Sequence, residues 1–400
     1  MKILRKNKEH LEKARSLIPL ASQTLSKSYI RFPEDFPNFI SHADGARVVD
    51  LDGNEYVDLI NALGAVVLGY RDLDVDKAVK RVIDHGSIYS LSSTLETELA
   101  ELLIDLIPCA EMVRFCKNGS DATSGAIRLA RSVTGSDIVF TNGYHGWHDW
   151  AIEWNAAKEY GVPDIGITYY FDGNEDLKNR LKDLDHEVAA VIIDTMHYDG
   201  DLEELKKIVH DHGAILVFDE ILSGFRMSLG GIQEMENVVP DLATFGKAMG
   251  NGYPIACLVG RKDLMKEMDK IFFTGTYFGD NIGLAASIAT ITKMRNINAT
   301  DKLWKLGRDI TAYLERFTAD HELREFISIK GPAVMFDVVF KEEWMKILCQ
   351  MEMLHKGNVL WHGRSNNVSL AYNYSDISQI QKAYECGFKA IKEELRRKNL

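Results

Sequence analysis

The sequence predicts an α/β fold: a mostly parallel sheet between helices, with a smaller α+β unit formed from both chain ends. From about residue 95 to residue 290, short and almost uninterrupted apolar runs alternate with helical segments. Such runs are typical of parallel strands that helices cover on both faces. After about Thr290, long amphipathic helices with few strands indicate a second unit. A chain of 400 residues is long enough for two or three units.

The composition narrows the class of protein. Asp plus Glu outnumber Lys plus Arg by 59 to 47, and this formal net charge of −12 disfavours nucleic-acid binding. The five cysteines are scattered without a C-x-x-C pair, as expected for reduced thiols in a cytoplasmic protein without a zinc site. The charged N-terminal segment lacks the apolar run of a signal peptide, and no segment reaches the ~18 to 20 apolar residues of a membrane span. We therefore expect a cytoplasmic protein that binds no membrane.

The N-terminal segment and the small unit contain few strands. Residues 1–45 are expected to form a basic amphipathic helix and an extended arm, in which Pro33 and Pro37 prevent regular structure. Residues 46–60 indicate a hairpin that turns at Asp52-Gly53. Near the C-terminus we expect strands at 334–340 and 368–372. A final helix has six apolar residues on one face: Ile377, Ile380, Tyr384, Phe388, Ile391 and Leu395.

The large unit is expected to contain the parallel strands and the helices that connect them. Its apolar runs predict six strands, at 112–116, 137–141, 188–194, 214–219, 242–245 and 255–259. The helices are expected at 95–106, 121–132, 202–211 and 284–294.

Two residues that follow apolar runs suit one particular cofactor. Asp219 ends the strand in VFDEILSGF, where a carboxylate points into the ligand crevice of an open α/β sheet. Lys247 lies in a glycine-bounded turn of DLATFGKAMGNGYPIA. Pyridoxal phosphate needs a lysine that forms a Schiff base with its aldehyde and a carboxylate that keeps its pyridine nitrogen protonated. Lys247 and Asp219 can supply both groups, although either residue alone is more often structural or solvent-exposed.

A candidate phosphate site lies in FCKNGSDATSGAIRLAR, residues 115–131. This stretch predicts a strand, a turn and the start of a helix, which Ser120 can cap. Gly119 lets the backbone approach a ligand, and amides at a helix N-terminus bind anions. An ordinary capped helix explains the same residues, but Asp219 and Lys247 in the same chain favour phosphate binding.

Two further loops carry candidate contacts. In TNGYHGWHDW, Tyr144 could stack its ring on a flat cofactor. His145, His148 and Asp149 form a possible metal cluster, but no third strong ligand has a recognisable spacing, so we expect an aromatic pocket lining instead. In FFTGTYFGDN, Thr276 could donate to a phosphate or simply belong to a polar turn.

Taken together, these motifs resemble the class III pyridoxal-phosphate aminotransferases of fold type I, on the branch of glutamate-1-semialdehyde 2,1-aminomutase. The resemblance runs from about Ser22 to near the C-terminus. It is most specific in IPCAEMVRFCKNGSDATSGAIRLARSVTG, YHG, FDEILSGFR and FGKAMGNGYPIACLVGR. It implies a seven-stranded, mostly parallel sheet in the large domain. We expect that pyridoxal-phosphate domain at 61–290, with the arm and part of the small domain at 1–60 and the rest of the small domain at 291–400.

The resemblance also implies roles for individual residues. It places seven of them around the cofactor: Lys247 on the aldehyde, Asp219 on the pyridine nitrogen, Gly119 and Ser120 on the phosphate, Tyr144 and Ile221 on the two ring faces, and Thr276 on the phosphate held by a neighbouring subunit. The last match implies a homodimer with shared active sites. Arg226 is more often structural in this family and is left out of catalysis.

The reaction that the resemblance implies is transamination. An amino acid donor, with L-glutamate as the default, displaces Lys247 from the cofactor. The freed amine then acts as the general base of a 1,3-proton shift, while Asp219 stabilises the pyridinium ring. A carbonyl acceptor reverses the sequence.

Three departures from the family pattern bear on the substrate. The position of the arginine with which the aminomutase clamps its substrate falls near Ser28, and Arg31 is out of register. The segment NALGAVVLGY, residues 61–70, replaces one that carries a tryptophan. Asp194-Thr195 replaces Glu-Pro, and in the short loop that follows, His197 is a candidate for the contact with the phenolic oxygen of the cofactor.

These departures favour an aminotransferase that acts on a carbonyl-bearing small molecule, such as a sugar derivative of a surface-polysaccharide pathway. Two alternatives stay open. The aminomutase itself would need no external amino donor. A non-catalytic protein could retain the fold, although it would have no reason to keep both Asp219 and Lys247.

Overall fold

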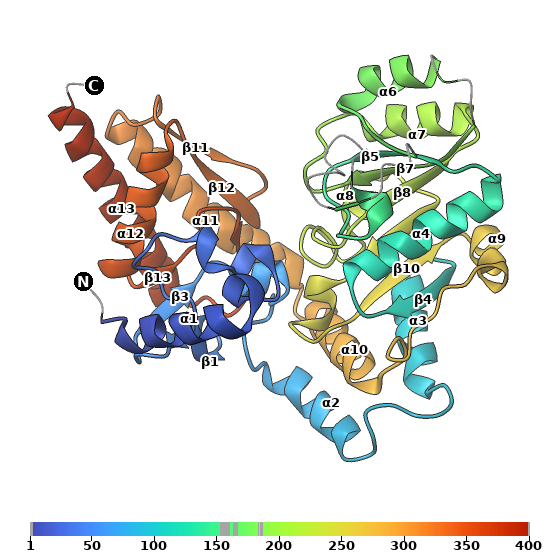
Figure 1. Ribbon diagram of the computed structural model, residues 1–400, viewed down its shortest axis with the longest axis horizontal. Coiled ribbons are helices and arrows are strands. Elements are labelled where there is room, and N and C mark those ends of the chain that lie inside the picture. The colour runs from blue at the N-terminus through green and yellow to red at the C-terminus, as the bar shows by residue number, and fades with distance from the viewer. Residues whose placement is uncertain (1–2, 153–160, 163–166, 183, 185–186, 399–400) are drawn as a thin grey trace. The chain divides into compact units, whose positions relative to one another are not determined.

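The chain divides into two compact units in a computed structural model (Figure 1). The small unit comprises Met1–Asp72 and Asp301–Leu400, and the large unit comprises Leu73–Thr300. The small unit thus takes in both chain ends. Its boundaries with the large unit follow residues 72 and 300, and the sequence analysis placed them near residues 60 and 290. The structure describes residues 3–152, 161–162, 167–182, 184 and 187–398.

The large unit contains a seven-stranded sheet with the strand order β4-β10-β9-β8-β7-β5-β6. Neighbouring strands are parallel from β9 to β6, and β10 is antiparallel to both β4 and β9. This confirms the mostly parallel sheet; β6, only three residues long, gave too short an apolar pattern to be predicted. The strands are β4 (Met112–Cys116), β5 (Ile138–Asn142), β6 (Thr168–Tyr170), β7 (Val188–Asp194), β8 (Ile215–Asp219), β9 (Leu242–Phe245) and β10 (Ala256–Gly260).

Helix α4 (Gly119–Thr134) packs its apolar side on this sheet. It ends at Gly135, whose φ of +73° is the left-handed conformation that commonly stops a helix. Because α4 begins directly after β4, its N-terminus lies at the carboxyl edge of the sheet. The buried residues between the helix and the sheet include Ala126, Ile127, Leu129, Ala130, Val139, Ala190, Ile192, Val217, Leu242 and Leu258.

The other helices of the large unit are α2 (Leu73–Ile83), α3 (Thr94–Leu106), α6 (Gly173–Lys182), α7 (Leu202–Asp211), α8 (Ile232–Met235), α9 (Lys262–Met265) and α10 (Asn281–Asn296). Among them, α7 packs on β8 and α3 on β4, while α2 packs on α10 (Figure 1). No helix within the described ranges of the chain is long and apolar enough to cross a membrane.

In its described residues, the small unit has two short sheets and four long helices. One sheet has the order β1-β2-β3-β13 and contains the predicted hairpin, β2 and β3; the other has the order β11-β12-β14. All six apolar residues predicted for one face of the last helix are buried. The strands are β1 (Ile40–Asp44), β2 (Arg47–Asp50), β3 (Glu55–Asp58), β11 (Ile327–Lys330), β12 (Met335–Phe340), β13 (Val359–Leu360) and β14 (Asn366–Asn367). The helices are α1 (Arg5–Leu17), α11 (Ala299–Asp320), α12 (Glu343–His355) and α13 (Tyr374–Arg397).

The prediction of a strand at 368–372 is wrong. The strand in this region is β14, which ends just before that segment, and a turn follows it. In the turn, the N–H of Tyr372 donates to the carbonyl of Ser369 at 3.2 Å, and the Ser369 hydroxyl accepts from the N–H of Ala371 at 3.3 Å. Val368 and Tyr372 are buried, so their apolar pattern reflects burial and not strand pairing.

Candidate active site

The carboxyl ends of the parallel strands place polar residues along one edge of the large sheet. Asp194 of β7 pairs in register with Asp219 of β8, and Asp219 pairs with Thr244 of β9. Asn142 ends β5 next to Ile193 of β7. Ligands of open α/β sheets bind at this edge, so the candidate site is built here.

Asp219 is held in a fixed orientation. Its Oδ1 accepts hydrogen bonds from the backbone N–H of Ile221 at 3.1 Å and from the hydroxyl of Thr244 at 3.3 Å. Its Oδ2 lies 2.8 Å from Nδ1 of His145, and the Asp219 side chain is only 6% exposed. A buried carboxylate with this many contacts can present a negative charge at a defined point without reorganising.

His145 is the residue of this site that the sequence analysis missed, because it was weighed only as a metal ligand. Its side chain is fully buried, and Nε2 lies 3.1 Å from the carbonyl oxygen of Asn142. Its own carbonyl accepts a hydrogen bond from the Thr123 hydroxyl of α4 at 2.8 Å. Its position in the loop directly after β5, at the same edge of the sheet as Asp219, could have indicated that it belongs to the site.

The other members of the suspected metal cluster have different partners. Nδ1 of His148 lies 2.6 Å from the Ser124 hydroxyl, which also accepts from the indole N–H of Trp150 at 2.7 Å. Asp149 is exposed. Among the described residues, the structure gathers no group of three side chains that could hold a metal ion. The contacts of His148 and Trp150 anchor the loop after β5 to α4.

Lys247 follows β9 and carries the amine of the site. Its φ is +43°, a left-handed conformation that is uncommon for a residue with a side chain. Burial lowers the pKa of the half-buried amine from its ordinary 10.5, while the negative charges of Asp219 and Asp194 oppose this shift. Within the described ranges, the amine has no hydrogen bond or ion pair. An amine that deprotonates more easily and is not paired is suited to attack a carbonyl carbon.

The N-terminus of α4 provides the candidate phosphate site. The expectation that Ser120 caps this helix is wrong, because Asn118 is the N-cap and exchanges hydrogen bonds with Asp121. Ser120 is the second helical residue, and its hydroxyl lies 3.4 Å from a backbone N–H of the loop after β5. The N–H groups of Gly119 and Ser120 have no partner within the helix and can bind an anion.

Three glycines bring these segments close together. A Cβ at Gly119 would lie 3.1 Å from the side chain of Ile221, and one at Gly246 would lie 3.2 Å from it. Ile221 therefore packs between the turn before α4 and the turn that carries the lysine. At Gly146, where φ is +110°, a Cβ would lie 2.3 Å from the Ser120 hydroxyl.

Two exposed side chains lie at the same edge. Tyr144 precedes His145 and is 73% exposed, so its ring is accessible to a ligand. Nδ1 of His197 lies 2.8 Å from Oδ2 of Asp194, and the His197 side chain is 52% exposed. The structure thus places His197 next to Asp194, one of the two aspartates whose negative charge raises the pKa of Lys247.

Thr276 lies apart from these residues along the chain, in the loop before α10. It is exposed and lines a cavity of about 740 Å³ together with segment 88–92. In the part of the chain that the structure describes, no contact joins Thr276 to Asp219 or Lys247.

Two buried charged residues lie on the segment after β8. Glu220 accepts hydrogen bonds from the N–H of Ile232 at 3.0 Å, the N–H of Gln233 at 3.1 Å and the hydroxyl of Thr195 at 3.2 Å. Arg226 is fully buried. The contacts of Glu220 hold the chain after β8 in place.

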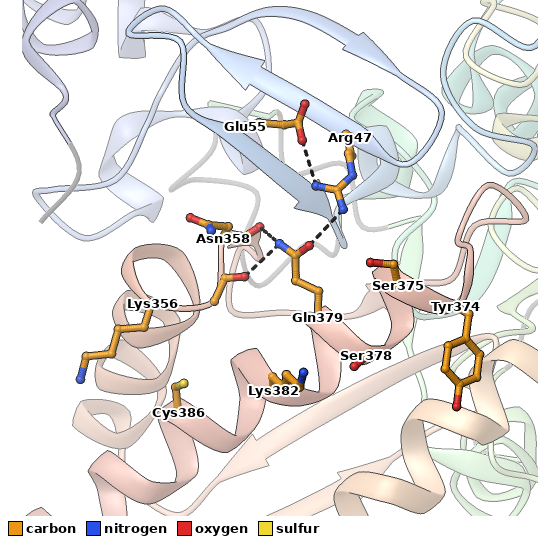
Figure 2. A pocket seen from close by; sticks show the side chains of 11 residues that line it. Arg47, Glu55, Lys356, Asn358, Tyr374, Ser375, Ser378, Gln379, Lys382 and Cys386 are labelled. Carbon is orange, nitrogen blue, oxygen red and sulfur yellow. Dashed lines mark hydrogen bonds and ion pairs between the residues drawn. The ribbon is translucent and has the colours of Figure 1, made fainter.

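A second cavity, of about 740 Å³, is built wholly from residues of the small unit (Figure 2). Arg47 at its wall is paired with Glu55 at 2.9 Å and with the buried Asp376 at 2.7 Å, and Gln379 accepts from it at 3.0 Å. Lys356, also on the wall, is paired with Glu352 of α12. Two of the basic side chains on the cavity wall, Arg47 and Lys356, therefore have carboxylate partners.

Comparison with known proteins places the chain in a family. The model of the class-III aminotransferases matches residues 31–372. A 3-aminobutyryl-CoA aminotransferase of Cloacimonas acidaminovorans is 36% identical over 344 residues, which cover 83% of each chain. A glutamate-1-semialdehyde 2,1-aminomutase of Methanococcus maripaludis is 34% identical over 343 residues, 79% of each chain. The FumI protein of Sphingopyxis sp. MTA144, solved in a form with pyridoxal phosphate, superposes with a TM-score of 0.90 at 27% identity over 98% of each chain.

The residues at the sheet edge fit the cofactor of this family. Lys247 has an amine that is unpaired in the part of the chain that the structure describes, and this amine suits an aldehyde. The fixed carboxylate of Asp219 suits a pyridine nitrogen, and the glycine-lined N-terminus of α4 suits a phosphate. The chain therefore belongs to the class-III aminotransferases, and its cofactor is pyridoxal 5'-phosphate.

Proposed function

We propose that this protein moves an amino group from L-glutamate to a carbonyl-bearing small molecule. One observation carries the proposal. Burial lowers the pKa of the Lys247 amine, and the negative charges of Asp219 and Asp194 partly oppose this shift. An amine in this setting can bind an aldehyde and, once released, accept a proton at neutral pH.

Four residues would hold the cofactor. When bound, pyridoxal phosphate supplies an aldehyde that takes up amino groups and a ring that accepts electrons. Lys247 would hold it covalently through Nζ, and Asp219 would keep a proton on its ring nitrogen. The backbone N–H groups of Gly119 and Ser120 would bind its phosphate, aided by the dipole of α4.

We assign three further contacts from the positions of the side chains. Tyr144 would stack on one face of the ring, because it is exposed directly beside His145. Ile221, packed between Gly119 and Gly246, would cover the other face. His197, fixed by Asp194, would approach the phenolic oxygen.

The proton transfer is assigned to Lys247. After release from the cofactor, Nζ would accept the proton from Cα of the amino donor and return it to the carbon that carried the aldehyde. Because burial lowers the pKa of this amine, a larger fraction is neutral near pH 7 than for an exposed lysine. Asp219 keeps its place throughout, since three groups hold its carboxylate.

We infer the class of the amino acceptor from the positions at which the sequence departs from the family pattern. Ser28, near the position of the family's clamping arginine, is fully buried and donates to the carbonyl of Leu20 at 2.8 Å, so it has a structural role. A site without that arginine is less committed to a small carboxylated substrate. Two classes of acceptor remain: a sugar derivative, and 3-oxobutyryl-CoA, the carbonyl counterpart of the amine in the name of the relative at 36% identity.

A second candidate activity is that of glutamate-1-semialdehyde 2,1-aminomutase, which the relative at 34% identity favours. The two activities differ in one requirement, because an aminomutase moves the amino group within one molecule. Turnover of glutamate 1-semialdehyde without added donor would therefore favour the aminomutase.

We also propose a homodimer with shared active sites. Thr276 is exposed, and the neighbouring Phe272 and Tyr277 are 80% and 63% exposed. Exposed aromatic residues of this kind mark contact surfaces. A partner subunit on this surface would let Thr276 donate to the phosphate of the partner's cofactor.

The shared site is tested by mixing Lys247→Ala chains with Thr276→Val chains. Only mixed dimers would contain one site in which both residues are intact.

The test of the proposed activity is a single-turnover measurement. L-Glutamate is added to the protein loaded with pyridoxal phosphate, and the 2-oxoglutarate released without any acceptor is quantified. We expect about one equivalent per site, and none from Lys247→Ala. Each acceptor is then added to find which one restores multiple turnover. Release of no 2-oxoglutarate by a loaded protein would overturn the assignment of the donor.

A further inference from the structure

We propose that Lys117 and Asp280 are positioning residues, whose ion pair joins the phosphate-binding turn of one subunit to the loop that reaches the cofactor of its partner. The proposal rests on the proposed homodimer, in which Thr276 donates to the phosphate held by the neighbouring subunit. It goes beyond that function because it gives the two active sites a common support.

Lys117 lies between β4 and the N-cap of α4. It directly precedes Asn118, and the amides of Gly119 and Ser120 that would bind the phosphate follow. Its Nζ pairs with Oδ2 of Asp280, and the two side chains are only 18% and 12% exposed. A pair of this kind is costly to break, because the charge that remains would lose its compensation. The pair is therefore a firm link between the turn before α4 and the start of α10.

Asp280 also fixes the loop in front of α10. Its Oδ1 accepts hydrogen bonds from the N–H groups of Ile282 at 3.1 Å and Gly283 at 3.2 Å, and thereby caps the helix. Its own N–H donates to the carbonyl of Tyr277 at 3.2 Å, in the turn directly after Thr276. Because both carboxylate oxygens and the backbone are engaged, a displacement of the ion pair would move the end of the loop that carries Thr276.

Gly283 makes room for the lysine amine at the first turn of α10. A Cβ at this position would lie 3.2 Å from Nζ of Lys117 and 2.9 Å from the carbonyl oxygen of Pro254. The N-terminus of a helix carries a partial positive charge, so a cation placed there needs a compensating anion. Asp280 supplies that anion, and the amine would be repelled from this position without it.

Two arginines hold the other end of the same loop. Arg114 of β4 donates to the carbonyl of Phe273 at 3.2 Å, and Arg128 of α4 donates to the carbonyl of Phe272. Residues 272–280 are therefore attached at both ends to β4, α4 and the turn between them. The loop and the phosphate-binding turn thus form one supported element.

In a dimer with shared sites, each ion pair would have two tasks. Within its own subunit it steadies the turn that contains Gly119 and Ser120, and across the interface it holds Thr276 at the partner's phosphate. Errors of about 1 Å in such geometry can reduce catalysis by roughly 100-fold. Loss of the pair should therefore weaken cofactor binding at both active sites.

The effect across the interface is tested with heterodimers purified from two differently tagged chains. One chain is unmodified, and the other carries Lys247→Ala together with Asp280→Asn. The intact Lys247 then lies opposite the altered loop. Asparagine can still cap α10, so only the charge is removed. The dissociation constant of pyridoxal phosphate is measured from the absorbance of the lysine-linked cofactor, which forms only on the unmodified chain.

We expect this dissociation constant to rise about tenfold relative to a heterodimer whose second chain carries Lys247→Ala alone, because the loop is misplaced. A role confined to the subunit that contains the ion pair would leave the constant unchanged. That result would overturn the proposal.

The pairing itself is tested by a double-mutant cycle in homodimers. Lys117→Met, Asp280→Asn and their combination are compared by the same titration and by urea unfolding. Each single substitution should raise the dissociation constant about tenfold, and the combination no further, since all three remove one charge-assisted contact. Stability should recover in the combined variant, which leaves no unpaired charge, whereas affinity should not. Additive effects on affinity would overturn the pairing.

The matched control is Arg295→Gln. Arg295, in the last turn of α10, pairs with Asp105 of α3 at 2.8 Å, and both side chains are more than half exposed. We expect its cofactor affinity to stay within about twofold of the original protein. If the variants of Lys117 and Asp280 match this control in a dimer that binds the cofactor, this proposal alone is wrong. A monomer, or a protein that fails to bind pyridoxal phosphate at Lys247, would overturn the proposed function together with it, so the two failures are distinguishable.

Discussion

Asp194 and Asp219 are in-register neighbours on strands β7 and β8, and each carboxylate lies 2.8 Å from Nδ1 of a histidine. The partner of Asp219, His145, is fully buried, whereas the partner of Asp194, His197, is 52% exposed. A buried hydrogen-bonded pair is held rigidly, and a partly exposed pair can adjust to a ligand. The two pairs therefore suit different tasks at one site: Asp219 presents a fixed charge, and the ring of His197 is accessible to a substrate or cofactor oxygen.

Replacement of Asp219 by Asn should lower kcat by about 100-fold or more, because an amide cannot keep a proton on the ring nitrogen of the cofactor. The amide oxygen can still accept from Ile221 and Thr244, so the fold should be preserved. Single-turnover release of 2-oxoglutarate measures the effect. Asp241→Asn, a buried aspartate at the opposite edge of the sheet, is the control. Equal activity of Asp219→Asn and Asp241→Asn would show that the charge of Asp219 is not needed.

The rate at which the apoprotein captures pyridoxal phosphate should rise with pH through a midpoint below 10.5. Burial lowers the pKa of Lys247, so its reactive neutral amine becomes abundant at a lower pH than that of an exposed lysine. By the same sign, the buried ammonium destabilises the apoprotein at low pH, and this cost decreases as pH rises from the lowered pKa to the ordinary 10.5. The rate is measured by the visible absorbance of the lysine-bound cofactor. A lysine derivative in the same buffers corrects for titration of the cofactor; a protein midpoint equal to that of the derivative would contradict the prediction.

Replacement of Gly146 by Ala should weaken the binding of pyridoxal phosphate by about tenfold or more. The φ of +110° is strained for any residue with a Cβ, and the new methyl group would lie 2.3 Å from the Ser120 hydroxyl, forcing the phosphate-binding turn to move. Gly135→Ala is the control, because φ is also positive there but no atom lies within 4 Å of the added carbon. Fluorescence titration of both apoproteins gives the comparison. Equal losses in the two variants would mean that backbone strain, and not the contact with Ser120, determines affinity.

Replacement of Glu220 by Gln should destabilise the fold by about 1 to 3 kcal/mol. Both carboxylate oxygens accept from N–H groups, Ile232 on one and Gln233 on the other, so the amide –NH2 would face a donor whichever way it turned. Burial raises the pKa of Glu220, so the native fold loses part of its stability as pH rises from the ordinary value of 4.5 through the raised one. Urea unfolding measures the change, with the exposed Glu236→Gln as the control. A loss no larger than that of the control would contradict the contact analysis.

Much of the large unit could be predicted because its strands are buried on both faces. All seven residues of β7 are buried, and such an apolar run is typical of a parallel strand that helices cover on both faces. The positions of Asp219 and Lys247 followed from the same pattern, since Asp219 is the last residue of β8 and Lys247 lies two residues after the end of β9, where carboxyl ends of strands face the crevice. The family resemblance then supplied the roles proposed for Gly119, Tyr144 and Ile221.

The details that failed depend on contacts between distant segments or on competition between neighbours. His145 and Asp219 are 74 positions apart and meet only because β5, β7 and β8 are aligned in register. At the start of α4 the sequence analysis expected Ser120 as the cap, but the hydrogen bonds between Asn118 and Asp121 make Asn118 the N-cap. The residue types alone did not show at which residue the helix begins.

The central claim is that Lys247 holds the cofactor, and one measurement tests it most directly. The protein is incubated with pyridoxal phosphate, reduced with sodium borohydride to make the linkage permanent, digested and analysed by peptide mass spectrometry. The account predicts one modified residue, Lys247, and no modification of Lys247→Ala under the same conditions. Stoichiometric modification of another lysine, or none at all in a folded protein saturated with the cofactor, would contradict it.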